Sequence, residues 1–418
     1  MRRLGFVAGL VLTLGAASPV MADHHQVSGG GVNGSHVRFF VPEPDHGAIK
    51  QIARLRKKGA KHDAALIRKM VETPQAVWFT GGTPREVRHA VRATVKRAQA
   101  EKTVPVLVAY NIPFRDCSQF SAGGATSTDA YLAWIDGFAK GIGKARVVVI
   151  LEPDGLGIIP WYNPFGDRDG SSGLEWCQPG EADAATAASD RFFQLSQAVA
   201  RLKAQRHAAV YLDGTHSAWL GSGDAAERLV KAGVLDADGF FTNVSNFQED
   251  QRLIKHATWT SECIAFANNA DEGGWRLGHY EWCASQYFPA NPNDFSTWHL
   301  SDEWYAANLG AATPTAHFVI DSSRNGQGPW VPPADHPAGD PQDWCNPPDR
   351  GTGVRPTAHT GTPLLDAYLW IKIPGQSDGQ CNRWAPAGSP DPVRGKVDPP
   401  AGDWFPDMAL ELARNANP

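Results

Sequence analysis

The sequence lacks the signatures of several large protein classes. No Gly-x-Gly-x-x-Gly opens a helix after an apolar strand, and no Gly-x-x-x-x-Gly-Lys-[Ser/Thr] occurs, so dinucleotide-binding and P-loop proteins are excluded. There is no Cys-x-x-Cys pair, so zinc is not expected and no metal is predicted. The formal net charge of −5 gives no basic excess, which excludes a nucleic-acid partner.

Long apolar runs are also missing, except for one at the N-terminus. Two arginines precede the apolar stretch 4–17, and Val20-Met21-Ala22 forms a small-x-small cleavage site. This order predicts a secretory signal peptide over residues 1–22, because the stretch is shorter than the ~20 residues that span a bilayer. A membrane anchor is the alternative. We expect a secreted protein, extracellular or periplasmic, with no membrane partner.

The rest of the chain has the composition of a folded domain. Hydrophobic residues make up 42%, and the 15 Trp need flat apolar partners in a core or on a ligand. Residues 23–35 are rich in Gly and Ser and predict a flexible leader, and no further linker divides residues 36–418. Six cysteines predict three disulfides in an oxidising compartment, but their spacing alone does not choose the pairs.

Apolar runs alternate with helical patterns along this domain. Runs without polar alternation are typical of strands buried on both faces, as in a parallel sheet. The predicted strands are 37–41, 76–79, 104–110, 146–152, 208–212, 239–242, 316–320 and 365–371. The predicted helices are 48–72, 84–101, 127–143, 183–205, 223–233, 302–309 and 404–415. The repeat of strand and helix predicts an α/β fold, either a barrel or an open doubly wound sheet.

Polar side chains at the strand ends decide between these two folds. Carboxylates or amides follow six strands: Asp116, Glu152 with Asp154, Asp213, Asn243, Asp321 and Asp378. In a barrel all strand ends converge on one face, where active sites form, whereas an open sheet uses only a few ends. The sequence therefore favours a barrel with an acidic mouth.

Two long stretches without a regular pattern follow strand ends. Residues 155–182 and 247–300 are rich in aromatic side chains and should overhang the same face. An insertion that packs on itself is the alternative for 247–300. An acidic, aromatic barrel mouth fits carbohydrate, because indole rings stack on sugars and glycosidic cleavage needs two carboxyl groups. A secreted serine esterase is the competing class of hydrolase.

Six local motifs resemble those of glycoside hydrolase family 6, the inverting cellulases, which include endoglucanases and cellobiohydrolases. Residues 110–117 read Tyr-Asn-Ile-Pro-Phe-Arg-Asp-Cys, and residues 147–154 read Val-Val-Val-Ile-Leu-Glu-Pro-Asp. The other matching blocks, in family order, are 211–219, 242–246, 343–346 and 369–375. The resemblance covers residues 36–418 and implies one glycoside hydrolase catalytic domain, a distorted seven-stranded parallel β/α barrel.

The resemblance also implies roles for individual residues. Asp154 would be the general acid, with a pKa raised by a neighbouring carboxylate, and Asp116 would be that neighbour. Tyr110 would crowd the reacting sugar and favour its distortion. Asp378 aligns with the proposed base, and it either accepts a proton directly or binds sugar. Asp213 would orient Arg or His neighbours.

Further side chains would bind the glucan or hold the loops. The implied sugar contacts are Trp78, His216, Trp219, Asn246, Trp344, Lys372 and Gln376. The Trp side chains could instead belong to the core, and His216 could be structural. The family pairs Cys117 with Cys177 and Cys345 with Cys381, which leaves Cys263 with Cys283.

The sequence departs from the family at three places, one of which is Thr80, where some members have an Asp near the first Trp. Gln376 stands where the family has Glu, which removes a charge but keeps an acceptor. Ala122 occupies the position of a Ser that positions water, with Ser121 one residue earlier, so the water relay is not assigned.

Loop length bears on how the glucan is cut. Family exoglucanases roof the cleft with a long loop between the base and the next Cys, but here Asp378 and Cys381 are three residues apart. The spacing predicts an open cleft and internal cleavage of β-1,4-glucan. The alternative is that the 247–300 stretch builds a different roof or blocks one end of the cleft. The alternatives are an exo-acting cellobiohydrolase, a non-catalytic glucan-binding protein and a structural envelope protein. We expect cello-oligosaccharide or β-1,4-glucan as partner, no cofactor, and a monomer.

Overall fold

The computed structural model describes residues 32, 37–167, 173–270 and 274–417. The predicted signal peptide, residues 1–22, and most of the predicted leader, residues 23–35, lie outside the described residues. In the described part of the chain, none of the helices combines the length and the apolar character needed to cross a membrane.

Seven parallel strands form one sheet, and their spatial order is their order along the chain. They are β1 (Val77–Phe79), β2 (Val106–Ala109), β3 (Val147–Leu151), β4 (Ala208–Asp213), β5 (Gly239–Thr242), β6 (His317–Asp321) and β7 (Leu365–Leu369). The sheet curls into a distorted half-barrel, so the predicted fold class is confirmed. Its edges approach at one end, where the Ala76 N–H donates to the Trp370 carbonyl oxygen over 2.9 Å.

The strands are buried on both faces of the curled sheet. Successive side chains of a strand point to opposite faces. In β2, Val106 and Val108 join one buried apolar cluster, whereas Leu107 and Ala109 join the cluster shared with the surrounding helices. This two-sided burial explains why the strands appear in the sequence as unbroken apolar runs.

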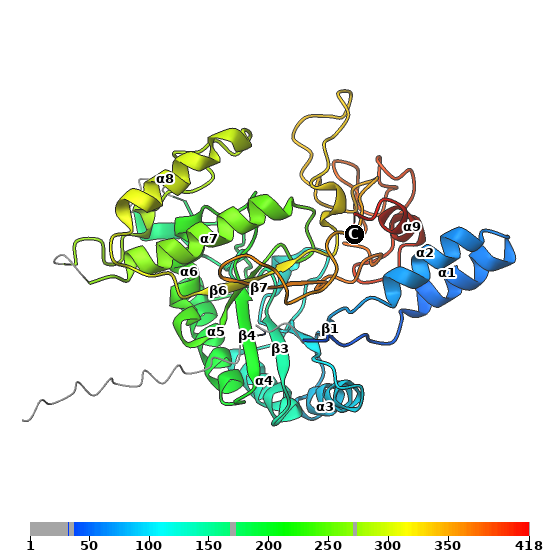
Figure 1. The fold of residues 1–418 in the computed structure, drawn as a ribbon, viewed down its shortest axis with the longest axis horizontal. Coiled ribbons are helices and arrows are strands. Elements are labelled where there is room, and N and C mark those ends of the chain that lie inside the picture. The colour runs from blue at the N-terminus through cyan, green and yellow to red at the C-terminus, as the bar shows by residue number, and fades with distance from the viewer. Residues whose placement is uncertain (1–31, 33–36, 168–172, 271–273, 418) are drawn as a thin grey trace, which may run out of the picture.

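Helices cover the outside of the half-barrel (Figure 1). They are α3 (Pro84–Ala100), α4 (Thr128–Ile142), α5 (Ala187–Lys203), α6 (Ser222–Lys231), α7 (Asp250–Ala267) and α8 (His299–Asn308). α3 begins at a capping box, in which Thr83 and Glu86 each accept a backbone N–H of the other, and Pro84 follows in the first turn. These side chains satisfy amide groups that a helix start leaves without partners.

Three helices from the two ends of the domain pack together beside the sheet (Figure 1). They are α1 (His46–Lys57), α2 (Lys61–Val71) and α9 (Pro406–Arg414). The Trp404 indole N–H donates to the Gln51 side chain over 2.6 Å, and Arg414 pairs with Asp63 over 2.6 Å. Side-chain contacts therefore join the first and last helices of the domain.

Two predicted elements near the start of the domain differ in the structure. The predicted strand 37–41 is reduced to one parallel bridge between Phe39 and Val104. The predicted helix 48–72 is split into α1 and α2 at Gly59, whose φ is 79°. A glycine adopts this left-handed conformation easily, which ends α1 and lets α2 start in a new direction.

The prediction that residues 247–300 lack regular structure is wrong for their first part. They contain α7, a helix of 18 residues, and the first residues of α8. Buried side chains such as Leu253, Thr260 and Cys263 occur around most of the α7 surface. A helix buried in this way shows no single apolar stripe, so its period is hidden in the sequence.

All three predicted disulfide pairs form. Cys117–Cys177 ties the turn after β2 to the irregular stretch 155–182. Cys345–Cys381 joins two loops that flank β7, and Cys263–Cys283 ties α7 to the segment that follows it. Each bond thus connects a long loop to another part of the fold.

Candidate active site

The carboxyl ends of the strands meet at one edge of the half-barrel. Several non-glycine residues there have left-handed backbone conformations, which such residues rarely adopt. They are Asp116 (φ 59°), Glu152 (φ 53°), Asp154 (φ 62°), Thr215 (φ 56°), Asn243 (φ 74°) and Ser245 (φ 67°). Conformations of this kind cost of order 1–3 kcal/mol each and cluster at functional sites. The backbone therefore marks this edge as the candidate site.

Glu152 and Asp154 follow β3 and have different surroundings. Glu152 is fully buried, and its carboxylate accepts the backbone N–H groups of Asn111 and Ile112 over 2.9 and 3.0 Å. Burial raises the pKa of Glu152 to about 7. Its contacts hold the segment after β2, so Glu152 has a structural function.

Asp154 is partly exposed and lies among other acidic groups. Burial raises its pKa well above the ordinary value for Asp, and the negative charges of Asp213 and Asp116 raise the pKa further. Lys372 acts in the opposite direction but does not outweigh them. The Asp154 carboxyl group is therefore held protonated above the pH at which an ordinary Asp ionises.

Asp213 is buried at the end of β4 and fixes the segment that follows Asp154. Its carboxylate accepts the backbone N–H groups of Leu156 and Gly157, each over 3.1 Å, and that of Thr215 over 2.9 Å. The sequence suggested Arg or His side chains as its partners, whereas its hydrogen bonds go to backbone amides. Asp213 thus couples the exits of β3 and β4.

Asp116 lies after β2, in a turn pinned by the Cys117 disulfide. Its carboxylate accepts the Ser121 N–H over 2.6 Å. Burial raises the pKa of Asp116 to about 6. The Ser121 backbone is thus fixed next to a carboxyl group that titrates near neutral pH.

Tyr110 and Trp78 form one wall of the site. Their rings meet edge to face with centroids 5.4 Å apart. The Trp78 indole N–H donates to the Ile371 carbonyl oxygen over 2.8 Å, which ties β1 to the end of β7. The Arg115 guanidinium lies 4.5 Å from the Tyr110 ring centre. Tyr110 is buried and Trp78 only partly so, which leaves indole surface accessible.

Asp378 carries a charge that two cations stabilise. The Arg324 guanidinium lies 2.9 Å from its Oδ1, and Lys372 Nζ lies 3.4 Å from the same atom. The Asn346 N–H donates to Oδ2 over 3.1 Å. Burial opposes ionisation, but Arg324 and Lys372 outweigh it and lower the pKa of Asp378 below its ordinary value. Asp378 is therefore ionised where Asp154 is protonated.

Asp321 holds the ends of β6 and β7 together. Its carboxylate accepts the N–H groups of Ile371 over 3.1 Å and Lys372 over 2.9 Å. Arg324 follows three residues later and is fully buried. The sequence interpretation missed Arg324, since only the tertiary structure brings its guanidinium to Asp378; its position just after a strand end was the one available signal.

His216 and Trp219 follow β4 on the other side of Asp154. Their rings lie 5.7 Å apart, and both side chains are partly exposed. Burial lowers the pKa of His216 to about 3, so the imidazole is neutral at ordinary pH. A Cβ at Gly157 would lie 2.4 Å from the Trp219 ring, which shows that the indole lies directly on the segment after Asp154.

Three more predicted sugar contacts lie in loops. Trp344 is partly exposed, with its ring centre 6.3 Å from that of Phe120. The Asn246 amide donates to the Val244 carbonyl oxygen over 3.3 Å. Gln376 donates to Asp45, the N-cap of α1, over 3.1 Å. The structure thus gives Gln376 a partner in the protein, and sugar binding by all three stays a prediction.

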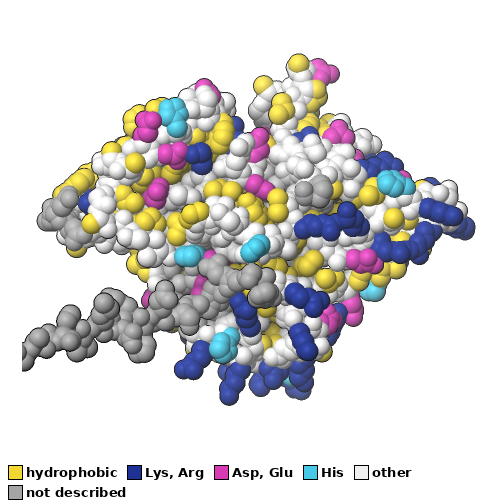
Figure 2. All heavy atoms as spheres, viewed as in Figure 1, with side chains coloured by type: hydrophobic (Ala, Val, Ile, Leu, Met, Phe, Trp, Pro, Cys, Tyr) yellow, Lys and Arg dark blue, Asp and Glu magenta, His cyan; other side chains and the backbone are white. Residues whose placement is uncertain are grey.

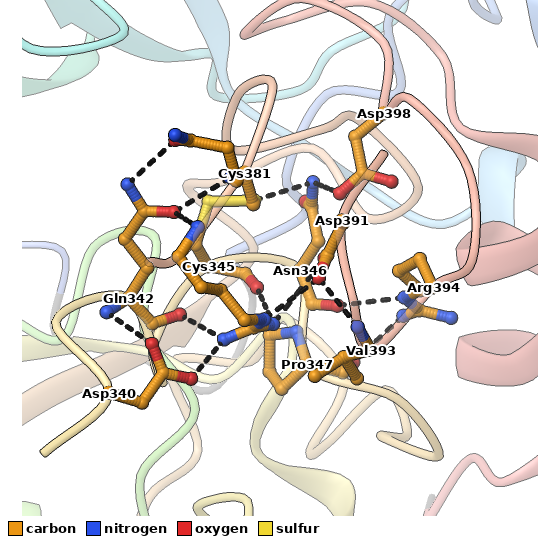
Figure 3. A network of polar contacts seen from close by, with 12 residues as sticks. Asp340, Gln342, Cys345, Asn346, Pro347, Cys381, Asp391, Val393, Arg394 and Asp398 are labelled. Atoms are coloured by element: carbon orange, nitrogen blue, oxygen red, sulfur yellow. Dashed lines mark hydrogen bonds and ion pairs between the residues drawn. A yellow bond between two sulfur atoms is a disulfide. The ribbon is translucent and has the colours of Figure 1, made fainter. Parts of the chain in front are cut away.

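A polar network supports the loops that carry Asp378 and its neighbours (Figure 3). Arg383 pairs with Asp391 over 2.8 Å, and the Asn346 amide donates to Asp398 over 2.8 Å. Cys381, Asp391 and Asp398 have ligand atoms within 4.8 Å of one another. The Cys381 sulfur is part of a disulfide and Asp391 is paired with Arg383, so this group does not have the chemistry of a metal site.

Residues 375–379 read Gly-Gln-Ser-Asp-Gly, the Gly-x-Ser-x-Gly pattern of serine esterases. Ser377 is fully buried, and its hydroxyl donates to the Pro399 carbonyl oxygen over 2.8 Å, with the Gly379 carbonyl oxygen 3.1 Å away. It also accepts the Asn346 amide over 3.0 Å. A nucleophile must be exposed and next to a base. The contacts of Ser377 therefore argue against the esterase alternative.

The molecular surface is hollowed at the upper edge of the view in Figure 2. The notch lies between the part that carries α8 and a projection formed by the segment after β6, which is gold in Figure 1.

Comparison with known proteins agrees with this geometry. The family model described as "Glycosyl hydrolases family 6" matches residues 35–416. The chain is 34% identical over 355 residues to Endoglucanase 1 of Streptomyces sp. (strain KSM-9), which covers 84% of this chain and 72% of that protein. It is 30% identical over 380 residues to Endoglucanase A of Thermobispora bispora, which covers 91% of this chain. It spans 62% of that relative's length.

A solved structure has the same fold. The endoglucanase Cel6 from Mycobacterium tuberculosis, in complex with methyl-cellobiosyl-4-deoxy-4-thio-β-D-cellobioside, superposes with a TM-score of 0.62 at 29% sequence identity. The superposition covers 91% of this chain and 98% of that one.

Proposed function

Because the chain belongs to the glycosyl hydrolases of family 6, we propose that it hydrolyses internal β-1,4-glucosidic bonds of cellulose or β-glucan with inversion of configuration. Two lines of observation support internal cleavage. The relatives named above are endoglucanases. Asp378 and Cys381 are also too close in sequence to carry a roof over the cleft. The three disulfides support secretion into an oxidising compartment.

The contrasting surroundings of Asp154, which lies among acidic groups, and of Asp378, which contacts two cations, carry the proposal. Glycosidic cleavage needs a carboxylic acid that is still protonated at working pH and a carboxylate that is not. Burial and the charges of Asp213 and Asp116 supply the first condition at Asp154. Arg324 and Lys372 supply the second at Asp378. We assign Asp154 as the general acid that protonates the departing glycosidic oxygen.

Asp116 and Tyr110 assist at the reacting sugar. A carboxylate at Asp116 keeps the proton on Asp154 and stabilises the positive charge that develops at the anomeric carbon. Tyr110 forms a rigid wall, packed by Trp78 and Arg115, against which the sugar ring can distort. The glucan stacks on Trp78 and Trp344 on one side of Asp154, and on Trp219 on the other.

The contacts of Asp378 bear on whether it accepts a proton directly or acts at the sugar. Its two cationic partners and the Asn346 N–H reduce its basicity, so it is a weak direct acceptor for the proton of the attacking water. We propose that Asp378 chiefly holds Lys372 in position toward the sugar, and that the proton of the attacking water reaches Asp378 through a chain of water molecules.

Two measurements test the proposed function. NMR of the anomers released from cellohexaose should show inversion of configuration. The variant Asp154→Ala should no longer hydrolyse cellohexaose. Carboxymethylcellulose should lose viscosity early, before many reducing ends appear. Retention of configuration would refute the mechanism. Slow loss of viscosity with release of cellobiose would assign exo action instead.

A further inference from the structure

The segment after α7 reaches the Trp219 side of the site. We name residues 284–289 the bordering segment. The Tyr287 hydroxyl donates to the Trp219 carbonyl oxygen over 2.8 Å. The neighbouring Gln286 amide donates to the Leu220 carbonyl oxygen over 2.9 Å. These two bonds fix the bordering segment along the backbone that carries the Trp219 indole.

The bordering segment is held in place from the other side as well. The Tyr305 hydroxyl of α8 donates to the Ala284 carbonyl oxygen over 2.9 Å, and the Ser301 hydroxyl donates to the Ser285 carbonyl oxygen over 2.7 Å. The preceding residue, Cys283, is bound to α7 by a disulfide. Bonds to two helices and to the β4 exit make it a rigid support.

This rigid support presents aromatic surface to solvent. Tyr287 is 44% exposed and Phe288 is 77% exposed. One edge of the Tyr287 ring rests on Gly221, where a Cβ would lie 3.7 Å away. No aromatic ring packs on Tyr287 in the part of the chain that the structure describes. A ring that is fixed yet uncovered is suited to ligand contact.

The order of the strands gives the order in which the aromatic side chains of the site follow one another. Trp219 follows β4, in the middle of the strand order, whereas Trp78 lies on the edge strand β1. Asp154, after β3, lies between them in that order. A glucan that follows this order would pass Trp78, Asp154 and Trp219 in turn. Tyr287 is bonded to the Trp219 backbone, and its ring adjoins Gly221, two residues further along the chain.

We propose that Tyr287 stacks on a glucose unit beyond the one at Trp219 and so lengthens the glucan-binding groove. The inference rests on the proposed function and gives the bordering segment a role in chain-length preference. Phenol rings, like indoles, offer a flat apolar face that matches the face of a pyranose. The 247–300 stretch thereby extends the groove on this side instead of blocking it.

Binding of short and long cello-oligosaccharides tests the proposal. In an Asp154→Asn background, calorimetry compares cellobiose with cellohexaose for Tyr287→Ala, Tyr287→Phe and Phe288→Ala. Tyr287→Ala should weaken cellohexaose binding about tenfold and change cellobiose binding less than about twofold. Tyr287→Phe keeps the ring and should stay within about twofold of the parent. Phe288→Ala is the matched surface control and should leave both affinities unchanged.

Other results would overturn the proposal. Equal losses for both ligands, or equal losses for the Phe and Ala variants, would show that Tyr287 acts only by positioning Trp219. Tighter cellohexaose binding by Tyr287→Ala would show that the ring blocks the groove. A failed function has a different signature, because the parent protein would then bind no cello-oligosaccharide of any length.

Discussion

Individual carboxyl groups show how surroundings set chemistry at this site. Asp154 and Asp378 have the same side chain, yet burial with acidic neighbours raises the pKa of Asp154, and cations lower that of Asp378. Glu152 is more deeply buried than Asp154, but its carboxylate accepts hydrogen bonds from the Asn111 and Ile112 backbone and so has a structural function. The partial exposure of Asp154 therefore favours it over Glu152 as the proposed acid.

We predict that Asp154→Asn lowers kcat on cellohexaose by at least about 10²-fold, the usual contribution of a general acid. The loss should be much smaller on an aryl cellobioside with an acidic phenol, because that leaving group departs without protonation. Steady-state kinetics on both substrates provide the check. Equal losses on the two substrates would contradict the assignment.

The charge of Asp116 should appear in the pH dependence of activity. A general acid works while it is protonated, so kcat falls as pH rises through the pKa of Asp154. Asp116→Asn removes one negative charge that raises this pKa. The alkaline limb of the kcat profile should therefore move to lower pH in the variant. A limb that stays in place would show that another group controls it.

Secondary-structure elements show where sequence patterns were sufficient. The starts of α3 and α4 were predictable because Thr83 and Ser127 cap them through their side chains. α7 was not predictable, because burial on most sides removes the one-sided apolar period. The strand expected at 37–41 is not formed, because its backbone makes a single bridge, at Phe39 opposite Val104. Local signals thus located the capped helices and the apolar buried strands, and missed the helix that is buried on most sides.

The Cys263–Cys283 bond offers a test at the scale of one element. Its loop of 20 residues should stabilise the fold by about 3 kcal/mol in the chain-entropy model. Cys263→Ala with Cys283→Ala should lower the urea midpoint yet preserve cleavage of short cello-oligosaccharides. The matched control is the Cys345/Cys381 pair, whose removal should also lower kcat, since it borders Asp378. If the Cys263/Cys283 variant lost activity on short cello-oligosaccharides, this disulfide would also support the catalytic site, contrary to the prediction.

For the whole molecule, stability should depend on pH through buried groups. Burial raises the pKa of Glu152 and Glu262 to about 7, so the folded state holds protons that the unfolded chain has released. Burial lowers the pKa of His216 to about 3 and of His256 to about 4, which acts in the opposite direction below the ordinary His pKa of about 6.5. Above that value the groups with a raised pKa, which are the two Glu and His317, still release protons from the folded state.

The melting temperature should therefore fall as pH rises from about 6.5 to 8. Glu262→Gln should reduce this fall, because the variant has no proton to lose there. Scanning calorimetry of both proteins across the range gives the answer. A slope that is unchanged in the variant would exclude Glu262 as a source.

At the same scale, the half-barrel and the identity of its acidic mouth could be predicted from the sequence. Strand-end carboxylates such as Asp154 and Asp213 follow apolar runs that any reader can locate. What could not be predicted is how distant segments meet. Gln376 donates a hydrogen bond to Asp45, 331 residues away in the sequence, and Arg324 donates one to Asp378, 54 residues away. Such pairs leave no periodic trace in a single chain.

The packing of α1 and α2 against α9 has a consequence for how the domain opens. Trp404 and Arg414 are bonded to Gln51 and Asp63, so neither end can fray while the other stays docked. Amide hydrogens of the first and last helices should exchange with solvent as one cooperative unit. Proteolysis within either group of helices would then require both groups to open together, although they are far apart in the chain.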